Sequence, residues 1–180
     1  MIAVISDIHD NLANLKTALD YSKSKNVSAL FVLGDITNSE TLAYLSKNFD
    51  GQIYLVHGNM ELYEPSEPSN YKNITDLGRK GDVIEIGSKL VGLCHEPYLA
   101  DDLIKKGAQI IFYGHTHKPW SSYAPYSPKT LIKQTEALAD KEEIKKGVKL
   151  VNPGNISNTL YSASFALWNE ITDELELKII

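Results

Sequence analysis

Histidines, carboxylates and one asparagine recur in this chain directly after short apolar runs. The 180 residues contain only five histidines, and two of them, His115 and His117, follow the apolar run at 109–114. Other apolar runs end in the same way, and the polar residues that follow them are Asp7, His9, Asp35, Asn59 and His95. Carboxylate, carboxamide and imidazole groups form a mixed oxygen and nitrogen ligand set, which suits divalent transition metals better than calcium. The pattern therefore predicts metal-dependent chemistry.

The number of these side chains indicates how many ions they hold. Seven ligands are too many for one tetrahedral ion, and they suit two ions that share a bridging carboxylate, with water completing each shell. Residues two apart in an extended strand point to the same side, so Asp7 with His9, and His115 with His117, are each expected to aim two groups into one site. This argument predicts a dinuclear centre.

Each residue also has a simpler interpretation when it is taken alone. An aspartate after a strand is commonly a turn former or a helix cap, and a lone histidine is commonly a packed or surface residue. That interpretation would have to hold separately at five strand ends, and the regularity of the pattern argues against it. His57 is different, because it lies inside an apolar run, and we expect it to have a structural role.

Alternating apolar runs and amphipathic stretches indicate how the first half of the chain positions these side chains. Strands are expected at 1–6, 28–34 and 52–58. Helices are expected between them, at about 12–25 with Asn11 as its cap and at 39–49 with Ser39 as its cap. Such alternation predicts a parallel sheet, and the carboxyl ends of its strands form the ligand-binding edge of an open α/β sheet.

The second half of the chain lacks the regular alternation of strands and helices that the first half shows. We expect a loop at 60–73, a hairpin at 82–95 that turns at Gly87 and Ser88, a helix that ends at Gly107, and strands at 109–114, 148–154, 162–170 and 174–180. We expect residues 119–148 to be an extra segment, in which prolines and aromatic residues precede an amphipathic helix at 129–147. A parallel first half and an antiparallel second half predict two mixed sheets in a single domain that spans 1–180.

Composition narrows the class of protein further. The chain has 18 basic and 23 acidic residues and a net charge of −5, which argues against a strong nucleic-acid surface but leaves a nucleotide substrate open. Cys94 is the single cysteine, so no intrachain disulfide forms. No apolar run approaches the ~18 residues of a membrane span, and the N-terminus lacks a basic region. We expect a cytoplasmic protein with no membrane partner, and a homo-oligomer is left open.

Together the motifs resemble those of the calcineurin-like metallophosphoesterases, in particular their small bacterial and archaeal phosphodiesterase branch. The motifs stand at 6–9, 34–35, 58–59, 95 and 114–117, and a late turn at 151–155 is also similar. The resemblance implies an α/β fold of four layers, a double β-sandwich of two mixed sheets flanked by helices. It also implies that one ion is held by Asp7, His9 and His117, and the other by Asn59, His95 and His115, with Asp35 as the bridge.

The same resemblance implies a hydrolase, a metal-dependent phosphodiesterase in which a hydroxide between the two ions attacks phosphorus. Asp35, Asn59 and His95 are the expected catalytic residues, and Glu61 and Asn11 are expected to orient the ligands. We expect two divalent transition ions per chain, with manganese favoured and nickel, iron or zinc as alternatives. The expected substrate is a small phosphodiester or a nucleotide.

Two other functions fit the same motifs. A phosphomonoesterase or nucleotide pyrophosphohydrolase would use the same metals, and a protein-interaction scaffold would use the same fold, as the retromer subunit of this superfamily does. One departure concerns Met60, which stands where many family members have a histidine thought to protonate the leaving group. Methionine cannot donate a proton, so solvent, Glu61 and His57 are the alternative donors, in that order.

Overall fold

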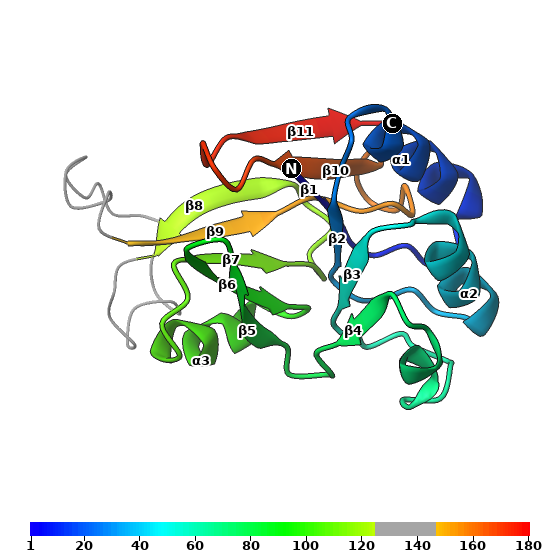
Figure 1. The fold of residues 1–180 in the computed structure, drawn as a ribbon, viewed down its shortest axis with the longest axis horizontal. Coiled ribbons are helices and arrows are strands. Elements are labelled where there is room, and N and C mark those ends of the chain that lie inside the picture. Colours follow the sequence, from blue (N-terminus) through cyan, green and yellow to red (C-terminus); the bar gives the residue numbers. More distant parts are fainter. Residues whose placement is uncertain (125–146) are drawn as a thin grey trace.

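The computed structural model describes residues 1–124 and 147–180, which form two β-sheets with helices on their outer faces (Figure 1). The first sheet has the strand order β11-β10-β1-β2-β3-β4. Its strands are β1 (Ile2–Ile5), β2 (Ala29–Val32), β3 (Gln52–Leu55), β4 (Ile74–Asp76), β10 (Ser164–Trp168) and β11 (Leu175–Ile179). The second sheet has the order β5-β6-β7-β9-β8. Its strands are β5 (Asp82–Ile86), β6 (Lys89–Cys94), β7 (Ile110–Tyr113), β8 (Trp120–Ala124) and β9 (Val148–Asn152).

Alternate residues of the central strands bury opposite faces of the first sheet. In β1, Ala3 and Ile5 pack into a core shared with the helices, whereas Ile2 and Val4 pack into the core between the two sheets. This two-residue period follows from the pleat of a strand. Because the sheet is covered on both faces, its central strands are apolar throughout rather than alternately polar. The sequence signal at 1–6 has this physical origin.

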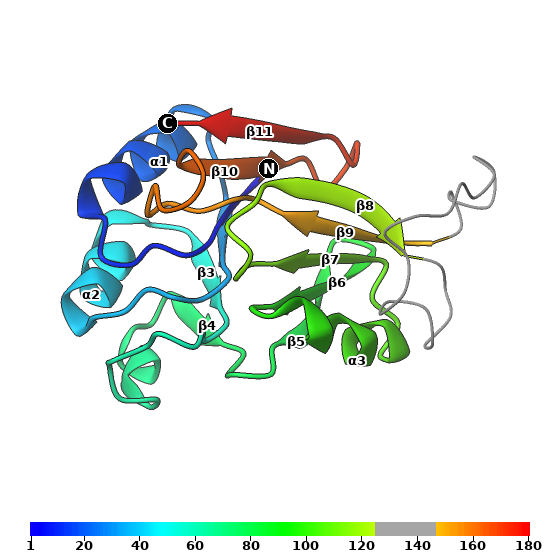
Figure 2. The same cartoon turned by 180° about the vertical axis from the view of Figure 1, so that it is seen from behind.

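Three apolar cores separate four layers. The helices α1 (Leu12–Ser24) and α2 (Ser39–Asn48) cover the outer face of the first sheet through residues such as Leu15 and Leu42. Phe31, Phe112 and Trp168 meet between the sheets, with ring centroids 5.3–6.3 Å apart. The helix α3 (Ala100–Lys105), which follows the short 3-10 turn η2 (Pro97–Leu99), covers the second sheet. Figure 1 and Figure 2 show α3 on the opposite side of the molecule from α1 and α2. The predicted four-layer fold is confirmed.

The distribution of the chain between the sheets differs from the simple division expected. The first sheet joins parallel strands β1 to β4 with the antiparallel strands β10 and β11 from the C-terminal end. The second sheet contains parallel pairs as well, because β7 lies between β6 and β9 and runs parallel to both. Both sheets are therefore mixed, but the first and last halves of the chain do not correspond to one sheet each.

Local structure differs from the sequence-based expectations at β4 and β8, in the loop at 60–73 and at the start of α2. Residues 74–76 form β4, and residues 120–124 form β8, which pairs with β9, so part of the extra segment 119–148 belongs to the second sheet. The expected loop at 60–73 contains one 3-10 turn, η1 (Glu67–Asn70). Ser39 does not cap α2; its hydroxyl donates to Glu67, and the Asn38 amide before it donates to Asp10.

Two other expectations concern helices. Asn11 caps α1 as expected, since its side chain accepts a hydrogen bond from the Asn14 amide. The amphipathic helix expected at 129–147 lies outside the described residues. Within 1–124 and 147–180, every helix is too short or too polar to cross a bilayer.

Candidate metal centre

The loops that follow β1, β2, β3, β6 and β7 converge, and they carry all seven predicted ligands. The approach is close because glycines precede three of the ligands. A Cβ atom at Gly58 would lie 2.0 Å from Asp35 Oδ1, and one at Gly114 would lie 2.0 Å from Ser6 Oγ. Real Cβ atoms do not come so close to other atoms, so only glycine lets these loops pack together. The Gly-Asn and Gly-His pairs of the sequence therefore reflect the packing of the loops around the site.

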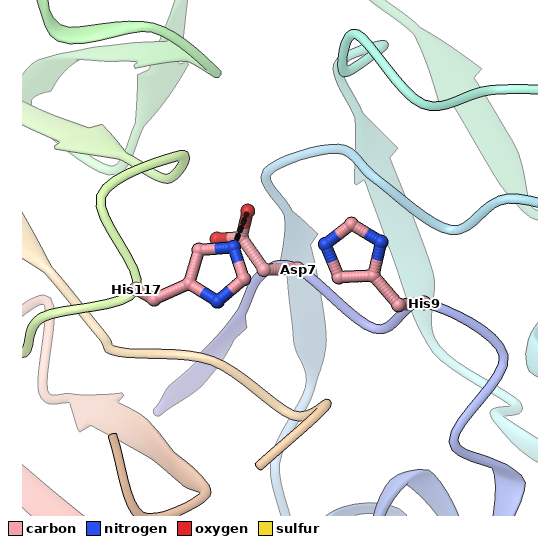
Figure 3. A group of neighbouring side chains, drawn as sticks. All are labelled: Asp7, His9 and His117. Carbon is pink, nitrogen blue, oxygen red and sulfur yellow. Dashed lines mark ion pairs between the residues drawn. The ribbon is translucent and has the colours of Figure 1, made fainter. Parts of the chain in front are cut away.

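The first cluster consists of Asp7, His9 and His117, which offer one ligand atom each within 4.8 Å of one another. Figure 3 shows the two imidazoles on either side of the Asp7 carboxylate, with His117 Nε2 3.4 Å from Asp7 Oδ1. The two rings are stacked with centroids 5.4 Å apart. Asp7 is fully buried, whereas both histidines are partly exposed, so the cluster opens toward solvent from a buried carboxylate.

The second cluster surrounds Asp35. The Asp35 Oδ2 atom lies 3.5 Å from His95 Nε2 and 3.6 Å from His9 Nε2, so this carboxylate stands between the two clusters. The Asn59 Oδ1 atom lies 3.0 Å from His95 Nε2 and 3.0 Å from His115 Nδ1. Asp7, Asp35 and His95 also offer ligand atoms within 4.8 Å of one another. The arrangement brings all seven residues into one continuous group.

The backbone at this edge is not extended, so the geometric reason given for the paired ligands was wrong. Asp7, His9, Asp35, His115 and His117 have φ angles of +44° to +68°. The left-handed region is uncommon outside glycine, although Asp and His enter it more readily than most residues. Hydrogen bonds hold the backbone there: the Asp7 amide donates to the Gly34 carbonyl at 3.0 Å, and the His9 amide donates to the Asp35 carbonyl at 2.9 Å. Tightly paired loops, rather than strand alternation, aim these side chains.

The electrostatics of the cluster favour a bound cation. Burial raises the pKa of Asp7 above its ordinary value, and the nearby His95 and His117 only partly oppose this effect. Burial alone would also raise the pKa of Asp35, but the hydrogen bond and charge of His95 outweigh it and hold that pKa low. Burial would lower the pKa of His95, but Asp35 raises it. The field of two close carboxylates attracts positive charge, whether a proton or a metal ion supplies it.

Two of the histidines are oriented by backbone carbonyls. His95 Nδ1 donates to the Leu33 carbonyl at 2.6 Å, and His117 Nδ1 donates to the Thr159 carbonyl at 3.3 Å. Because a carbonyl only accepts hydrogen bonds, each Nδ1 carries the hydrogen and the neutral ring keeps a lone pair at Nε2. Each Nε2 faces the carboxylates of the cluster. Metal-binding histidines are typically fixed in this way, so the donor set fits a divalent transition metal.

Glu61 ties together the loops that carry Asp35 and Asn59. Its carboxylate accepts hydrogen bonds from the amides of Ile36 at 3.3 Å, Thr37 at 2.9 Å and Gly58 at 3.0 Å. Both carboxylate oxygens are thus occupied as acceptors of backbone hydrogen bonds, and they hold the two loops at a fixed separation.

Asn11 lies further from the ligands. Its Nδ2 donates to the Ser157 carbonyl at 3.2 Å, and the Ser157 amide donates to the Asp7 carbonyl at 3.0 Å. Asn11 therefore joins the start of α1 to the loop beside the first cluster.

Two buried asparagines in the late turn position the histidine loop, a role that the sequence did not assign to them. Asn152 Nδ2 donates to the Gly114 carbonyl at 2.9 Å, and Asn155 Nδ2 donates to the His117 carbonyl at 3.1 Å. The two bonds hold opposite ends of the segment 114–117. The signal was present in the sequence as the turn at 151–155, but nothing in the chain order indicated which loop it contacts.

Two other residues considered from the sequence point elsewhere. His57 Nε2 lies 2.8 Å from Asp76 Oδ1 and its ring packs against Tyr63, so it is not aimed at the ligand clusters. Trp120, one of the aromatic residues of the segment 119–148, lines a separate groove with Leu175 and Leu177. The Lys118 ammonium lies over that ring, 5.7 Å from its centroid.

The comparisons with known proteins agree with this geometry. Residues 1–172 match the calcineurin-like phosphoesterase superfamily domain. The chain therefore belongs to the calcineurin-like phosphoesterase superfamily, whose members depend on divalent metals, and it is a metal-dependent phosphoesterase. A curated relative, "Phosphodiesterase MJ0936" of Methanocaldococcus jannaschii, is 26% identical over 123 residues, which are 65% of this chain and 73% of the relative.

Solved structures support the fold. A structure described as a novel archaeal phosphodiesterase has a TM-score of 0.78 and 18% identity and covers 99% of both chains. Yfce, a phosphoesterase from E. coli, has a TM-score of 0.63 and 15% identity, covering 99% of this chain and 98% of the other. Vps29 of Chaetomium thermophilum has a TM-score of 0.57 and 17% identity, covering 99% and 96%. At these identities the likeness concerns the fold alone.

Proposed function

We propose that this chain is a phosphodiesterase that works with two divalent transition ions. The observation that carries the proposal is the position of the Asp35 carboxylate, whose Oδ2 lies 3.6 Å from His9 and 3.5 Å from His95. A single carboxylate between two groups of ligands is the arrangement that a bridged pair of ions requires. The relative named as a phosphodiesterase supports the same reaction.

The residues divide between the two ions in the following way. Asp7, His9 and His117 would hold one ion, Asn59, His95 and His115 would hold the other, and Asp35 would contact both. Manganese is favoured, with nickel, iron and zinc as alternatives for this mixed ligand set. Asp7 and Asp35 together offset about two of the roughly four positive charges, and the remainder attracts an anionic phosphate to a protein of net charge −5.

The chain's own residues prepare the site for hydrolysis. Two such ions, when bound, act as Lewis acids on a phosphate and make a water molecule a stronger nucleophile at neutral pH. Asp35 would contact both ions, and Asn59 and His95 would hold the second ion beside it, so these three side chains would position the ions against the reacting phosphate. The Leu33 carbonyl fixes His95, and the Met60 amide donates to Asp35 Oδ1 at 2.8 Å, so neither side chain needs to reorganise during the reaction.

Metal reconstitution combined with a substrate panel tests the proposal. The metal-free protein is loaded separately with Mn²⁺, Ni²⁺, Fe²⁺ and Zn²⁺, and its metal content is measured by elemental analysis. Each form is then assayed on bis-p-nitrophenyl phosphate, p-nitrophenyl phosphate, a cyclic nucleotide and a nucleotide pyrophosphate. We expect two ions per chain and the highest kcat/KM on a diester.

Other outcomes favour the alternative functions. A preference for the monoester or the pyrophosphate would replace the phosphodiesterase by those activities. Two bound ions with no hydrolysis of any substrate would favour a protein-interaction scaffold, which the Vps29 fold neighbour makes relevant. One ion or fewer per chain, with no gain in activity on loading, would contradict the dinuclear site. A single domain over 1–180, a cytoplasmic location and a homo-oligomer stay predictions.

A further inference from the structure

The pocket over the metal centre is small and has one apolar wall. Its volume is about 340 Å³, which suits a small molecule rather than a polymer. Five predicted ligands line it together with two other residues, Met60 and Thr159; the ligands are His9, Asp35, Asn59, His115 and His117. The polar side chains account for a phosphate group, and Met60 provides a surface of different chemistry beside them.

Met60 is held at this wall by its backbone. Its amide donates to Asp35 Oδ1 at 2.8 Å, while 48% of the residue stays exposed to solvent. A thioether neither donates a proton nor binds phosphate, and its polarizable sulfur makes favourable contacts with aromatic rings. Because the amide fixes Met60 next to the central carboxylate, this side chain can touch a substituent of a phosphate bound there.

A second anionic group would find no cationic side chain among the described residues that line the pocket, none of which is a lysine or an arginine. Lys118, next to the ligand His117, has its ammonium over the Trp120 ring. A nucleic-acid strand or a polyphosphate depends on such cations for its additional phosphates.

The neighbours of the two non-ligand wall residues are apolar and exposed. Leu62, two residues after Met60, is 73% exposed, and its amide donates to the Thr37 carbonyl at 2.8 Å. Leu160, which follows Thr159, is 85% exposed. Neither leucine lines the pocket itself; both add exposed apolar surface to the loops that carry Met60 and Thr159.

We infer that the substrate is a small phosphodiester with a single phosphate, whose aromatic ester group packs against Met60. The inference rests on the proposed phosphodiesterase function. Met60 is then a specificity-determining residue for the substituent that stays on phosphorus.

Two diesters with the same leaving group test this inference. The probes are phenyl p-nitrophenyl phosphate and methyl p-nitrophenyl phosphate, and the quantity compared is the ratio of their kcat/KM values. Met60→Gln keeps the side-chain length and removes the apolar surface, Met60→Leu keeps an apolar surface, and Ile171→Thr changes an exposed apolar residue on the turn between β10 and β11. We expect Met60→Gln to lower the phenyl-to-methyl ratio about fivefold. Met60→Leu should retain most of the ratio, and Ile171→Thr should leave it unchanged.

A binding measurement separates this inference from the proposed function. Calorimetric titration of the manganese-loaded protein with phenylphosphonate and methylphosphonate should show tighter binding of the phenyl compound, and Met60→Gln should remove most of the difference. This readout holds even if the protein hydrolyses no diester, an outcome that would contradict the proposed function alone. Equal binding of the two phosphonates by the wild type, or an unchanged preference in Met60→Gln, would overturn the inference.

Discussion

Glu61, in the loop after β3, accepts a hydrogen bond from the Thr37 amide in the loop after β2, with its Oε2 atom 2.9 Å from the nitrogen. The other carboxylate oxygen accepts from the Gly58 amide at 3.0 Å. These contacts join the two loops that supply Asp35 and Asn59. Among the described residues, Glu61 makes no hydrogen bond to a predicted ligand, so its effect on the metals passes through the backbone.

Replacing Glu61 with glutamine should therefore weaken metal binding without removing a ligand. Glutamine has one acceptor oxygen and no charge, so it cannot satisfy the three amides as the carboxylate does. We expect the affinity for Mn²⁺, measured by calorimetric titration, to fall ~10–100-fold. The matched control is Glu64→Gln, which changes an exposed glutamate three residues away. Wild-type affinity in Glu61→Gln would show that the loops keep their positions without this carboxylate.

Asp35 should be more sensitive, because its carboxylate faces histidines of both clusters. Asp35→Asn keeps the shape of the side chain but removes the negative charge between the two ion positions. We expect fewer than two ions per chain by elemental analysis and a fall in kcat on bis-p-nitrophenyl phosphate of more than ~100-fold, beyond the effect typical of residues that only orient ligands. Asp50→Asn, at an exposed position, serves as the control. A near wild-type rate in Asp35→Asn would exclude Asp35 as the bridge.

The Asp7 carboxylate should lower the stability of the metal-free protein and raise the affinity for the metal ion. Burial raises the pKa of Asp7 above its ordinary value of 3.8, so folding of the metal-free protein disfavours the ionised carboxylate. The contribution of Asp7 to the stability of that form is then greatest below pH 3.8 and is lost as the pH rises through the folded pKa. An asparagine side chain cannot titrate, so metal-free Asp7→Asn should have a higher Tm than the metal-free wild type at pH 7. With Mn²⁺ added, the order should reverse, because the wild type binds the ion more tightly.

Scanning calorimetry at pH 7 with EDTA and with Mn²⁺ checks both parts of this prediction. In EDTA, the Tm difference between Asp7→Asn and the wild type should shrink when the pH is lowered below 3.8. Asp50→Asn should show no such dependence on metal. A metal-free Asp7→Asn that is less stable than the wild type at pH 7 would mean that the hydrogen bonds to Asp7 from the His115 amide outweigh the cost of its burial.

Strands that are buried on both faces could be predicted from the sequence alone. The run at 1–6 is apolar throughout because Ala3 and Val4 enter different cores, and a strand of that kind is a strong local signal. The strands β4 and β8 lack it. Residues 74–76 and most of residues 120–124 are exposed or half-buried at sheet edges, so their strand conformation depends on pairing with β3 and β9 rather than on composition.

The ligands of the candidate site could also be predicted from the sequence, but the structural reason for their spacing could not. A polar residue after each strand requires only the order of the chain. The left-handed backbone at His115 and His117 depends instead on contacts with distant loops, including the hydrogen bonds from Asn152 and Asn155. Such long-range contacts leave no periodic signal. The same holds for Glu61, whose three amide partners belong to two different loops.

The leaving group should control the rate, because none of the described residues considered as proton donors is placed to act as one. Met60 has no acidic hydrogen, both carboxylate oxygens of Glu61 accept hydrogen bonds from backbone amides, and the His57 ring contacts Asp76. Solvent remains as the donor. A positioned general acid contributes about 10²–10⁴-fold, so alkyl diesters should be cleaved slower than activated aryl diesters by at least that factor.

A series of methyl aryl phosphates, compared by kcat, should show a steep decrease as the pKa of the leaving phenol rises. Met60→His should raise kcat for the poorest leaving groups and change it little for p-nitrophenolate, whereas Met60→Leu should give no such gain. A flat dependence in the wild type would reveal a proton donor that these contacts do not identify.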